Sequence, residues 1–359
     1  MNRKLVFVFF IIFTSIFLIL YSVSTTAAPP PPAPSGNEVE KERIEEAAIK
    51  AINEHREFVL GYLVNDIQIS DVQLSEDETT GVIFLEMVDP ETGELLPSEP
   101  GLAFAIRTGD EWQVILPSDP GWIDLVQSAP QELLTDEYKI SYLEMYRTTV
   151  QTTQATYSGY LLPWDAGRTV YLSQSTGHDR YIPSGSAHYS FDFYISQTMY
   201  QLRAAKAGTV WRARWDVSNG NDDDMGNYLV LKDETTSPTT YQLYLHLAKD
   251  SIPQELRTVG AYVPQGQFIG IADDTGQSTG HHLHYHVHTY PNSYWGTSVD
   301  ITFDDVDING GRPRRQSDLE YCTRPGDVCT QYRNNYVSGN IAPGDIQPPI
   351  GDLFEPGTG

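Results

Sequence analysis

Five of the nine histidines in this chain lie in the segment 281–288, which reads HHLHYHVH. From residue 282 on, histidines alternate with apolar residues, and this period of two is typical of a β-strand. Residues i and i+2 of a strand share one face and lie roughly 7 Å apart. Neutral imidazoles at that spacing can converge on a metal ion, or on a substrate oxygen beside one. Four histidines are predicted to share the face: His282, His284, His286 and His288.

Two further segments carry side chains of the same kind. Without them, the histidine run could equally be an adventitious metal-binding patch or the solvated face of a strand. His188 precedes Asp192 by four residues, and His246 follows the strand-like segment 241–245. In a strand, residues i and i+4 share a face but lie roughly 13 Å apart. His188 and Asp192 can therefore bind one ion only if His188 sits on a bend that enters the strand, which the preceding Gly185-Ser-Ala favours.

Taken in order, these segments resemble the motifs of the lysostaphin and LytM-type zinc metalloendopeptidases. The motifs are HxxxD, Tyr-x-His-Leu and Ser-Thr-Gly-x-His-Leu-His-aromatic, found here at 188–192, 244–247 and 278–285. The resemblance covers roughly residues 160–290, little over a third of the chain. The N-terminal part lies outside it.

The resemblance implies a role for each matching residue. His188, Asp192 and His284 would bind one zinc ion per chain, and His246 and His282 would be the catalytic histidines. Three protein ligands leave one position for water, which marks a catalytic rather than a structural zinc site. Zinc-bound water would then attack an amide carbonyl that the metal polarises. The two unligated imidazoles can take up the proton and stabilise the oxyanion, in roles that the sequence does not assign.

The chain departs from the family pattern beside these residues. Glutamate is common after the aromatic residue in the family, and His286 stands there in this chain. His281 and His288 add further imidazoles, and we expect all three to support the ligands or to lie at the surface. His178 lies upstream of the first motif and is assigned to a loop.

By this resemblance the chain is a secreted zinc endopeptidase. Its substrate would be the peptide part of bacterial peptidoglycan or, alternatively, another secreted protein. The alternative is a non-catalytic LytM-like domain that binds or regulates cell-wall enzymes. Such relatives usually lack metal ligands, whereas all five key positions hold competent residues here. A zinc-dependent hydrolase of another bond, such as a deacetylase, would need a different order of ligands.

Composition and the N-terminus indicate the compartment. The formal net charge of −25 argues against binding nucleic acid or an anionic membrane surface. Residues 1–27 have the basic start, apolar run and small-residue end of a secretory signal peptide, with an uncleaved anchor as the alternative. We expect cleavage after Ala27, a secreted or cell-envelope location and no stable membrane span afterwards. Cys322 and Cys329 then favour a disulfide over a two-cysteine zinc site.

The rest of the sequence predicts a mainly β protein with two domains. A proline-rich linker spans 28–36, and helical periodicity followed by alternating strands predicts a small α+β domain over 37–150. Its role can be binding, spacing or inhibition. Residues 156–340 are rich in β-formers and turn residues and predict an antiparallel metallopeptidase domain. A Pro- and Gly-rich tail, predicted to be disordered, spans 341–359.

A second metal site is a weaker hypothesis. Asp305, Asp307 and Asn309 fit the opening of a calcium-binding loop. Gln316 stands at the twelfth position, where such loops carry a bidentate glutamate.

Overall fold

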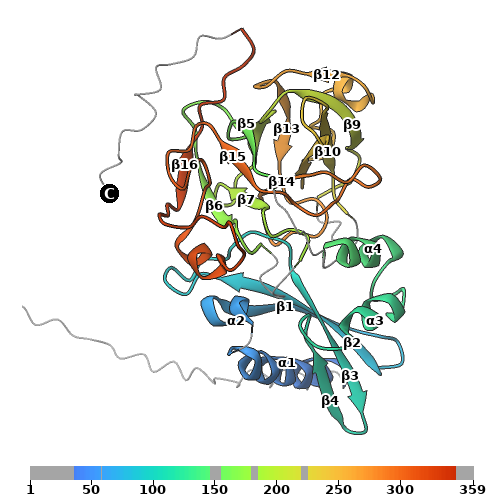
Figure 1. Cartoon of the computed structure of the whole chain (residues 1–359). Helices are drawn as coiled ribbons and strands as arrows, with labels where there is room; N and C mark the ends of the chain where they lie inside the picture. The colour runs from blue at the N-terminus through green and yellow to red at the C-terminus, as the bar shows by residue number, and fades with distance from the viewer. Residues whose placement is uncertain (1–35, 58, 146–154, 179–184, 220–224, 345–359) are drawn as a thin grey trace, which may run out of the picture. The chain divides into compact units, whose positions relative to one another are not determined.

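The computed structural model describes residues 36–57, 59–145, 155–178, 185–219 and 225–344 (Figure 1). The predicted signal peptide, nearly all of the linker and most of the predicted tail lie outside these residues. From Gly36 on, the chain forms one compact unit. Within the described ranges, no helix is both long and apolar enough to cross a membrane.

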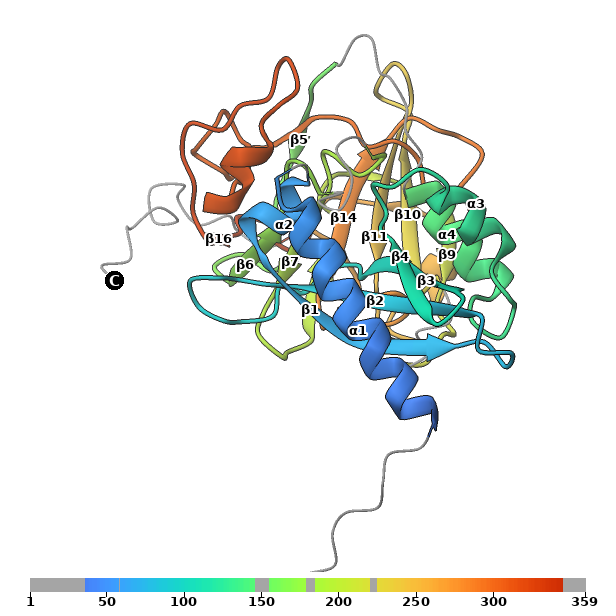
Figure 2. The same ribbon diagram turned by 90° about the horizontal axis from the view of Figure 1, so that it is seen from below.

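The N-terminal part of this unit is an α+β layer, as predicted. Helix α1 (Gly36–His55) runs across an antiparallel sheet of order β1-β2-β3-β4 (Figure 2). Apolar residues of α1 spaced four apart, Ile44, Ala48 and Ile52, are buried in a core shared with the sheet. The four strands are Asp66–Leu74, Thr80–Val88, Gly101–Thr108 and Glu111–Ile115.

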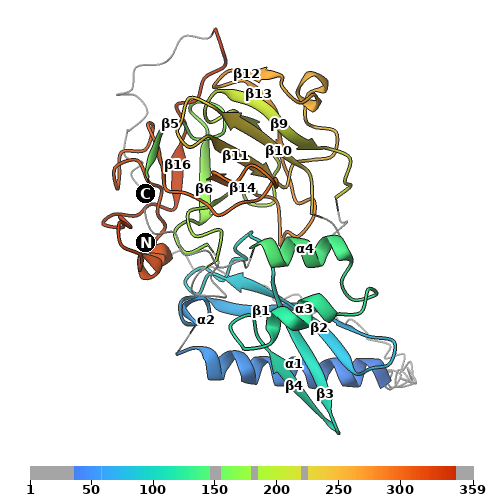
Figure 3. The same ribbon diagram turned by 45° about the vertical axis from the view of Figure 1, so that its right-hand side comes forward.

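Three shorter helices complete this part. They are α2 (Leu60–Val64), α3 (Trp122–Ser128) and α4 (Asp136–Met145). Figure 3 shows α3 and α4 on the side of the sheet opposite α1. The indole of Trp122 donates to the Leu102 carbonyl at 2.7 Å, and the Tyr142 hydroxyl donates to the Pro100 carbonyl at 2.9 Å. Both helices therefore fix the start of β3.

The C-terminal part is built on an eight-stranded sheet of order β12-β9-β10-β11-β14-β7-β6-β16, with every neighbouring pair antiparallel. Two small sheets, β13-β8 and β15-β5, flank it, and two 3-10 helices, η1 (Gln254–Arg257) and η2 (Gln316–Tyr321), lie in its connections. The predicted mainly β, antiparallel fold class is thus confirmed. Its strands are β5 (Tyr157–Tyr160), β6 (Thr169–Gln174), β7 (Phe191–Tyr194), β8 (Tyr200–Arg203), β9 (Gly208–Arg214), β10 (Tyr228–Asp233), β11 (Thr240–Leu245), β12 (Tyr262–Val263), β13 (Phe268–Ala272), β14 (Leu283–His288), β15 (Ile301–Phe303) and β16 (Asn335–Val337).

The histidine-rich segment is the strand β14, which lies between β11 and β7. In this register His284 lies opposite Asp192 of β7 on one side and Leu245 of β11 on the other. His246 follows β11 directly and has a φ of +63°, a left-handed conformation that is uncommon for a non-glycine residue. Strand order and register therefore bring the second and third predicted motifs to one place beside Asp192.

Both faces of β14 are buried. Its apolar residues, Leu283, Tyr285 and Val287, belong to the core of the C-terminal part. The histidine face lies toward a second core, in which Leu243 and Trp295 of the C-terminal part join side chains of α1 and β1–β4. A solvated strand face is therefore excluded, and the two parts share a core. The domain boundaries at 150 and 156 stay predictions.

The calcium-loop hypothesis is not supported, because its three side chains have separate partners. Asp305 accepts hydrogen bonds from the backbone N–H groups of Leu162 (3.0 Å) and Gly339 (2.8 Å). Asp307 pairs with Arg333. The Asn309 side-chain oxygen accepts from the N–H of Thr330 at 2.8 Å. The predicted disulfide between Cys322 and Cys329 is present, with a Cα–Cα distance of 6.3 Å.

Candidate metal centre

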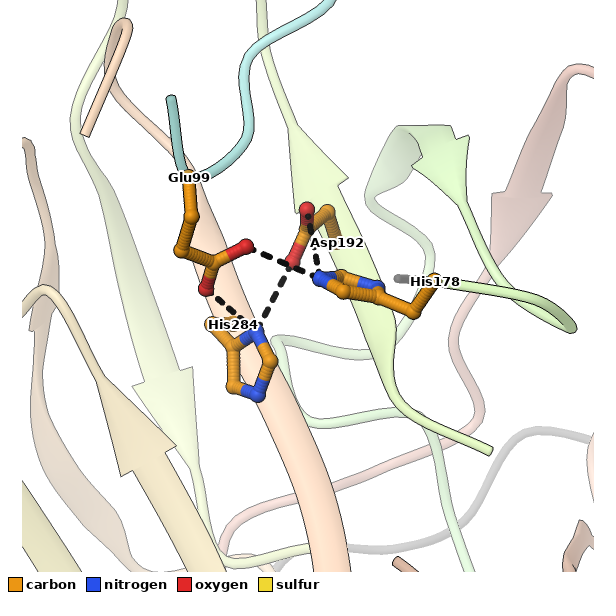
Figure 4. Close-up of side chains that lie close together, drawn as sticks. All are labelled: Glu99, His178, Asp192 and His284. Atoms are coloured by element: carbon orange, nitrogen blue, oxygen red, sulfur yellow. Dashed lines mark hydrogen bonds and ion pairs between the residues drawn. The ribbon is translucent and has the colours of Figure 1, made fainter. Parts of the chain in front are cut away.

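Four buried side chains converge beside β14 (Figure 4): Glu99, His178, Asp192 and His284. One ligand-type atom from each lies within 4.8 Å of all the others. Nδ1 of His284 lies 2.7 Å from Glu99 Oε1 and 3.2 Å from Asp192 Oδ1. Nε2 of His178 lies 2.9 Å from Glu99 Oε2 and 3.2 Å from Asp192 Oδ2. Two imidazole nitrogens and two carboxylates thus surround one point.

These side chains come from four separate segments. Asp192 and His284 are opposite each other on β7 and β14. His178 follows β6 after a turn at Gly177, whose φ is +72°. Glu99 lies in the connection between β2 and β3, in the N-terminal part of the unit. Only the first two positions follow from the strand pattern, because the others depend on how loops fold back onto the sheet.

Two further histidines point at the same place. His246 Nε2 lies 3.4 Å from Glu99 Oε1, and His282 Nε2 lies 3.7 Å from Asp192 Oδ1. The ring centroids of the two histidines are 4.5 Å apart. Nδ1 of His246 lies 2.8 Å from the Thr275 carbonyl, and Nδ1 of His282 lies 2.8 Å from the carbonyl of residue 280. Each Nδ1 therefore carries a proton, and each Nε2 faces the centre. Nε2 of His246 is hydrogen-bonded to Glu99, whereas Nε2 of His282 has no hydrogen-bond partner among the described residues.

Three buried polar atoms at this point lie at ion-pair distances from one another or from Glu99 but make no contact of hydrogen-bond geometry among the described residues. They are Asp192 Oδ1, His282 Nε2 and His284 Nδ1. An unsatisfied buried polar group costs roughly 1–3 kcal/mol, so three of them on one point call for a ligand. Imidazole nitrogens and a carboxylate oxygen are the donors that zinc prefers. The residues present therefore fit a zinc ion.

The two carboxylates have opposite pKa shifts. Burial and the neighbouring Glu99 raise the pKa of Asp192 well above its ordinary value. Burial also opposes ionisation of Glu99, but His284 and His178 outweigh it and hold the pKa of Glu99 well below its ordinary value. Two carboxylates this close do not both ionise readily without a cation between them. The electrostatics of the centre therefore also favour a bound cation.

His188, the first predicted ligand, is not part of this cluster. The predicted bend before β7 does form, but His188 Nε2 lies 3.2 Å from Asp327 Oδ2. Asp327 also accepts a hydrogen bond from the Tyr189 hydroxyl at 2.8 Å, and it lies in the loop closed by the disulfide. Asp327 thus holds the His188 imidazole, and His178 stands beside Asp192. This departs from the ligand set that the sequence predicts.

The remaining histidines of the run support the centre or lie beside it. His286 Nδ1 lies 2.9 Å from His284 Nε2, so it accepts the proton on the far side of that ring and leaves Nδ1 of His284 free for a metal. The His284 ring also stacks on Trp295, with centroids 5.0 Å apart. His288 Nε2 donates to the Tyr294 carbonyl at 3.0 Å. His281, which is partly exposed, pairs with the carboxylates of Asp273 and Asp274.

Comparison with known families agrees with this geometry. Residues 186–299 match the model of Peptidase family M23. This segment is an M23 peptidase domain. It contains Asp192, His246, His282 and His284, whereas Glu99 and His178 lie outside it. A peptidase domain of this family implies a bound metal, typically zinc.

Among solved structures, the chain is similar to a zinc containing peptidase from Vibrio cholerae, with 18% sequence identity and a TM-score of 0.23. The similarity covers 58% of this chain and 52% of that one, so the chain spans about half the length of that peptidase. No curated protein matches the chain. The N-terminal part before residue 186 is outside the M23 match.

Proposed function

We propose that this chain is a secreted, zinc-dependent endopeptidase that cleaves the peptide part of bacterial peptidoglycan. The observation that carries the proposal is the convergence, beside β14 of an M23 domain, of three buried donors and two histidines whose Nε2 atoms face the same centre. The proposed zinc donors are His178, Asp192 and His284. When bound there, zinc would supply Lewis-acid chemistry to the carbonyl of the scissile bond.

The chain's own residues would move the protons. His246 and His282 both hold their Nδ1 proton on a backbone carbonyl, so each turns Nε2 toward the reacting groups. One accepts the proton of the attacking water and can pass it to the leaving amine. The other, once protonated, donates a hydrogen bond to the developing oxyanion. Their ring centroids are 4.5 Å apart, so both reach the same carbonyl.

Secretion and the peptidoglycan substrate have separate support. The N-terminal sequence has the layout of a signal peptide, and the Cys322–Cys329 disulfide fits an oxidising compartment. The peptidoglycan substrate is proposed from the resemblance of the motifs to those of the lysostaphin and LytM-type peptidases. The non-catalytic alternative has no specific observation in its favour, because donors and proton-transfer groups are all present.

The decisive experiment counts zinc and bond cleavage separately. The chain from residue 28 on would be compared with His284→Ala and His282→Ala by metal analysis and by release of new amino termini from purified peptidoglycan. We expect one zinc per chain in the parent and in His282→Ala, and loss of zinc in His284→Ala. A parent protein without zinc would contradict the proposal. If the parent binds stoichiometric zinc but releases no new amino termini, the binding alternative is favoured.

A further inference from the structure

A second cluster of metal-ligand side chains lies outside the centre, in the loop that joins β13 to β14. Its members are Asp273, Asp274 and His281, and one ligand-type atom of each lies within 4.8 Å of the others. His281 Nδ1 is 2.8 Å from Asp273 Oδ1 and 3.5 Å from Asp274 Oδ2. Ligands placed about 2.0 Å from a tetrahedral zinc ion lie about 3.3 Å from one another. The spacing of these side chains therefore matches that of ligands around one ion.

The cluster differs from an ordinary group of surface carboxylates, because the Asp273 side chain is only 1% exposed. One buried atom of each residue, namely Asp273 Oδ1, Asp274 Oδ1 and His281 Nδ1, makes no contact of hydrogen-bond geometry among the described residues. In a simple ion pair, a protonated imidazole would aim its N–H at one of these oxygens. A buried polar atom without such a contact costs roughly 1–3 kcal/mol, so a cation between the three side chains fits better than an ion pair.

The charges of the cluster favour a divalent ion. Burial raises the pKa of Asp273, and Asp274 adds to the shift, whereas a hydrogen bond from Asn219 opposes it. Two ionised carboxylates beside a neutral imidazole carry two negative charges, which a divalent cation neutralises. Imidazole is a ligand of zinc and other transition metals, whereas calcium and magnesium take oxygen ligands. The donor set therefore selects a divalent transition-metal ion.

An ion can reach this cluster from solvent. The side chains of His281 and Asp274 are 24% and 32% exposed, so water can complete the coordination of a bound metal. The donors of the centre are all buried and include two imidazoles. We therefore expect zinc at the loop to exchange more readily than zinc at the centre.

The same loop orients both histidines that are proposed to transfer protons. The Thr275 carbonyl faces His246 Nδ1 and the Gly280 carbonyl faces His282 Nδ1, both at 2.8 Å. The backbone of Asp273 links the two histidines. Its N–H donates to the His246 carbonyl at 2.8 Å, and its carbonyl accepts from the His282 N–H at 3.0 Å. The position of this loop thus sets the direction in which both imidazoles point.

Asp273 and Asp274 begin the loop, and His281 lies at its other end. We propose that these three side chains bind a second divalent transition-metal ion, such as zinc, which joins the two ends of the loop and holds the carbonyls that orient His246 and His282. Joining the ends restricts the conformations open to the residues between them. The binding site is independent of the proposed peptidase function, because none of its ligands belongs to the centre.

The test titrates zinc into the chain from residue 28 on and counts bound ions by equilibrium dialysis and metal analysis. His281→Asn and Asp274→Asn each remove one ligand at a partly exposed position, where a substitution disturbs the fold least. His55→Asn is the matched control, because His55 is similarly exposed, at 25%, but pairs with the single carboxylate of Asp119. Hydrogen exchange of the backbone amides of residues 273–282 gives a second readout.

We expect the parent and His55→Asn to bind a second zinc ion at higher free zinc than the first, and to lose it on dialysis against a weak chelator. Both ligand variants should keep the first ion and lose the second. The second ion should also slow exchange of the loop amides in the parent, but not in His281→Asn.

Equal uptake of a second ion by the parent and both ligand variants would mean an adventitious ion only and would overturn the proposal. A parent that binds no second ion would overturn it as well. A second ion that requires His281 but leaves amide exchange unchanged would overturn the effect on the loop. A parent that takes up only the ion that depends on His281 would count against the centre and support the site in the loop.

Discussion

At the scale of single residues, each histidine turns one particular ring nitrogen toward the centre. That nitrogen is the atom with which the histidine can bind a metal or transfer a proton. His284 presents Nδ1 because His286 takes the proton on its Nε2. His246 and His282 present Nε2 because backbone carbonyls hold their Nδ1 protons. The alternating sequence predicts a shared face for the histidines of β14. It does not predict which nitrogen each presents, since that depends on partners 2 to 29 residues away.

The first prediction distinguishes His178 from His188 as the third zinc donor. His178→Ala should lose stoichiometric zinc, because His178 Nε2 lies 3.2 Å from Asp192. His188→Ala should retain it, because His188 faces Asp327 in the disulfide loop. Metal analysis after dialysis against a weak chelator would measure both. The reverse pattern would restore the HxxxD ligand set that the sequence predicts.

The residues of the centre that lie on or beside strands could be predicted from the sequence, whereas those in loops could not. Asp192, His246, His282 and His284 lie in strand-linked motifs, and sheet register brings such motifs together over long separations. Glu99 and His178 lie in loops, where position depends on tertiary packing that no local pattern encodes. His178 has one weak signal, the preceding Gly177, which marks a tight turn.

At the scale of elements, the turn at Gly177 places His178 against β7. Its φ of +72° favours glycine, and a Cβ added there would lie 2.4 Å from the Cβ of Tyr321 in η2. The N–H of Gly177 also donates to the His188 carbonyl at 2.9 Å. This one residue thus joins the His178 loop, the bend before β7 and the segment that precedes the disulfide.

We therefore predict that Gly177→Ala lowers the free energy of unfolding by more than about 1 kcal/mol, from backbone strain together with the clash, and weakens zinc binding. Gly93→Ala is the control, since Gly93 has a φ of +70° but nothing within 4 Å of an added Cβ. Urea unfolding and metal competition would measure the two effects. Equal losses in both variants would mean that the contact with Tyr321 has no separate effect.

The elements also show why β14 was only partly predictable. Its alternation indicates a half-polar strand, and such strands usually expose the polar face. Here the polar face is covered by the connection between β2 and β3 and by the shared core, so β14 is buried throughout. A helix and four strands before residue 120 were predictable from their own periodicity. Their packing over a strand near residue 285 was not predictable, because a local pattern does not indicate which distant segment an element packs against.

At the scale of the whole molecule, stability should depend on pH through Asp305. This carboxyl joins the segments after β5 and after β16 by accepting from the N–H groups of Leu162 and Gly339. Burial raises the pKa of Asp305 to about 6, although those N–H groups oppose the shift. A carboxyl whose pKa is raised on folding stabilises the folded state below its unfolded pKa, and the contribution is lost as pH rises through the folded pKa.

We predict that the contribution of Asp305 to the free energy of unfolding falls by about 2 kcal/mol between about pH 4 and pH 7. Asp305→Asn cannot titrate and should lack this component. The difference between the parent and the variant, measured by urea unfolding at both pH values, isolates the residue from the other titrating groups. Parallel pH profiles for the two proteins would contradict the prediction.

The position of Glu99 in the chain has a consequence for biosynthesis. Glu99 precedes His178 by 79 residues and His246 by 147, so it is made before every other side chain of the centre. Chains fold from the N-terminus as they emerge, so the segment that carries Glu99 exists before β14 has been synthesised. Until the C-terminal part has been made, Glu99 has none of the imidazole partners that it contacts in the folded chain.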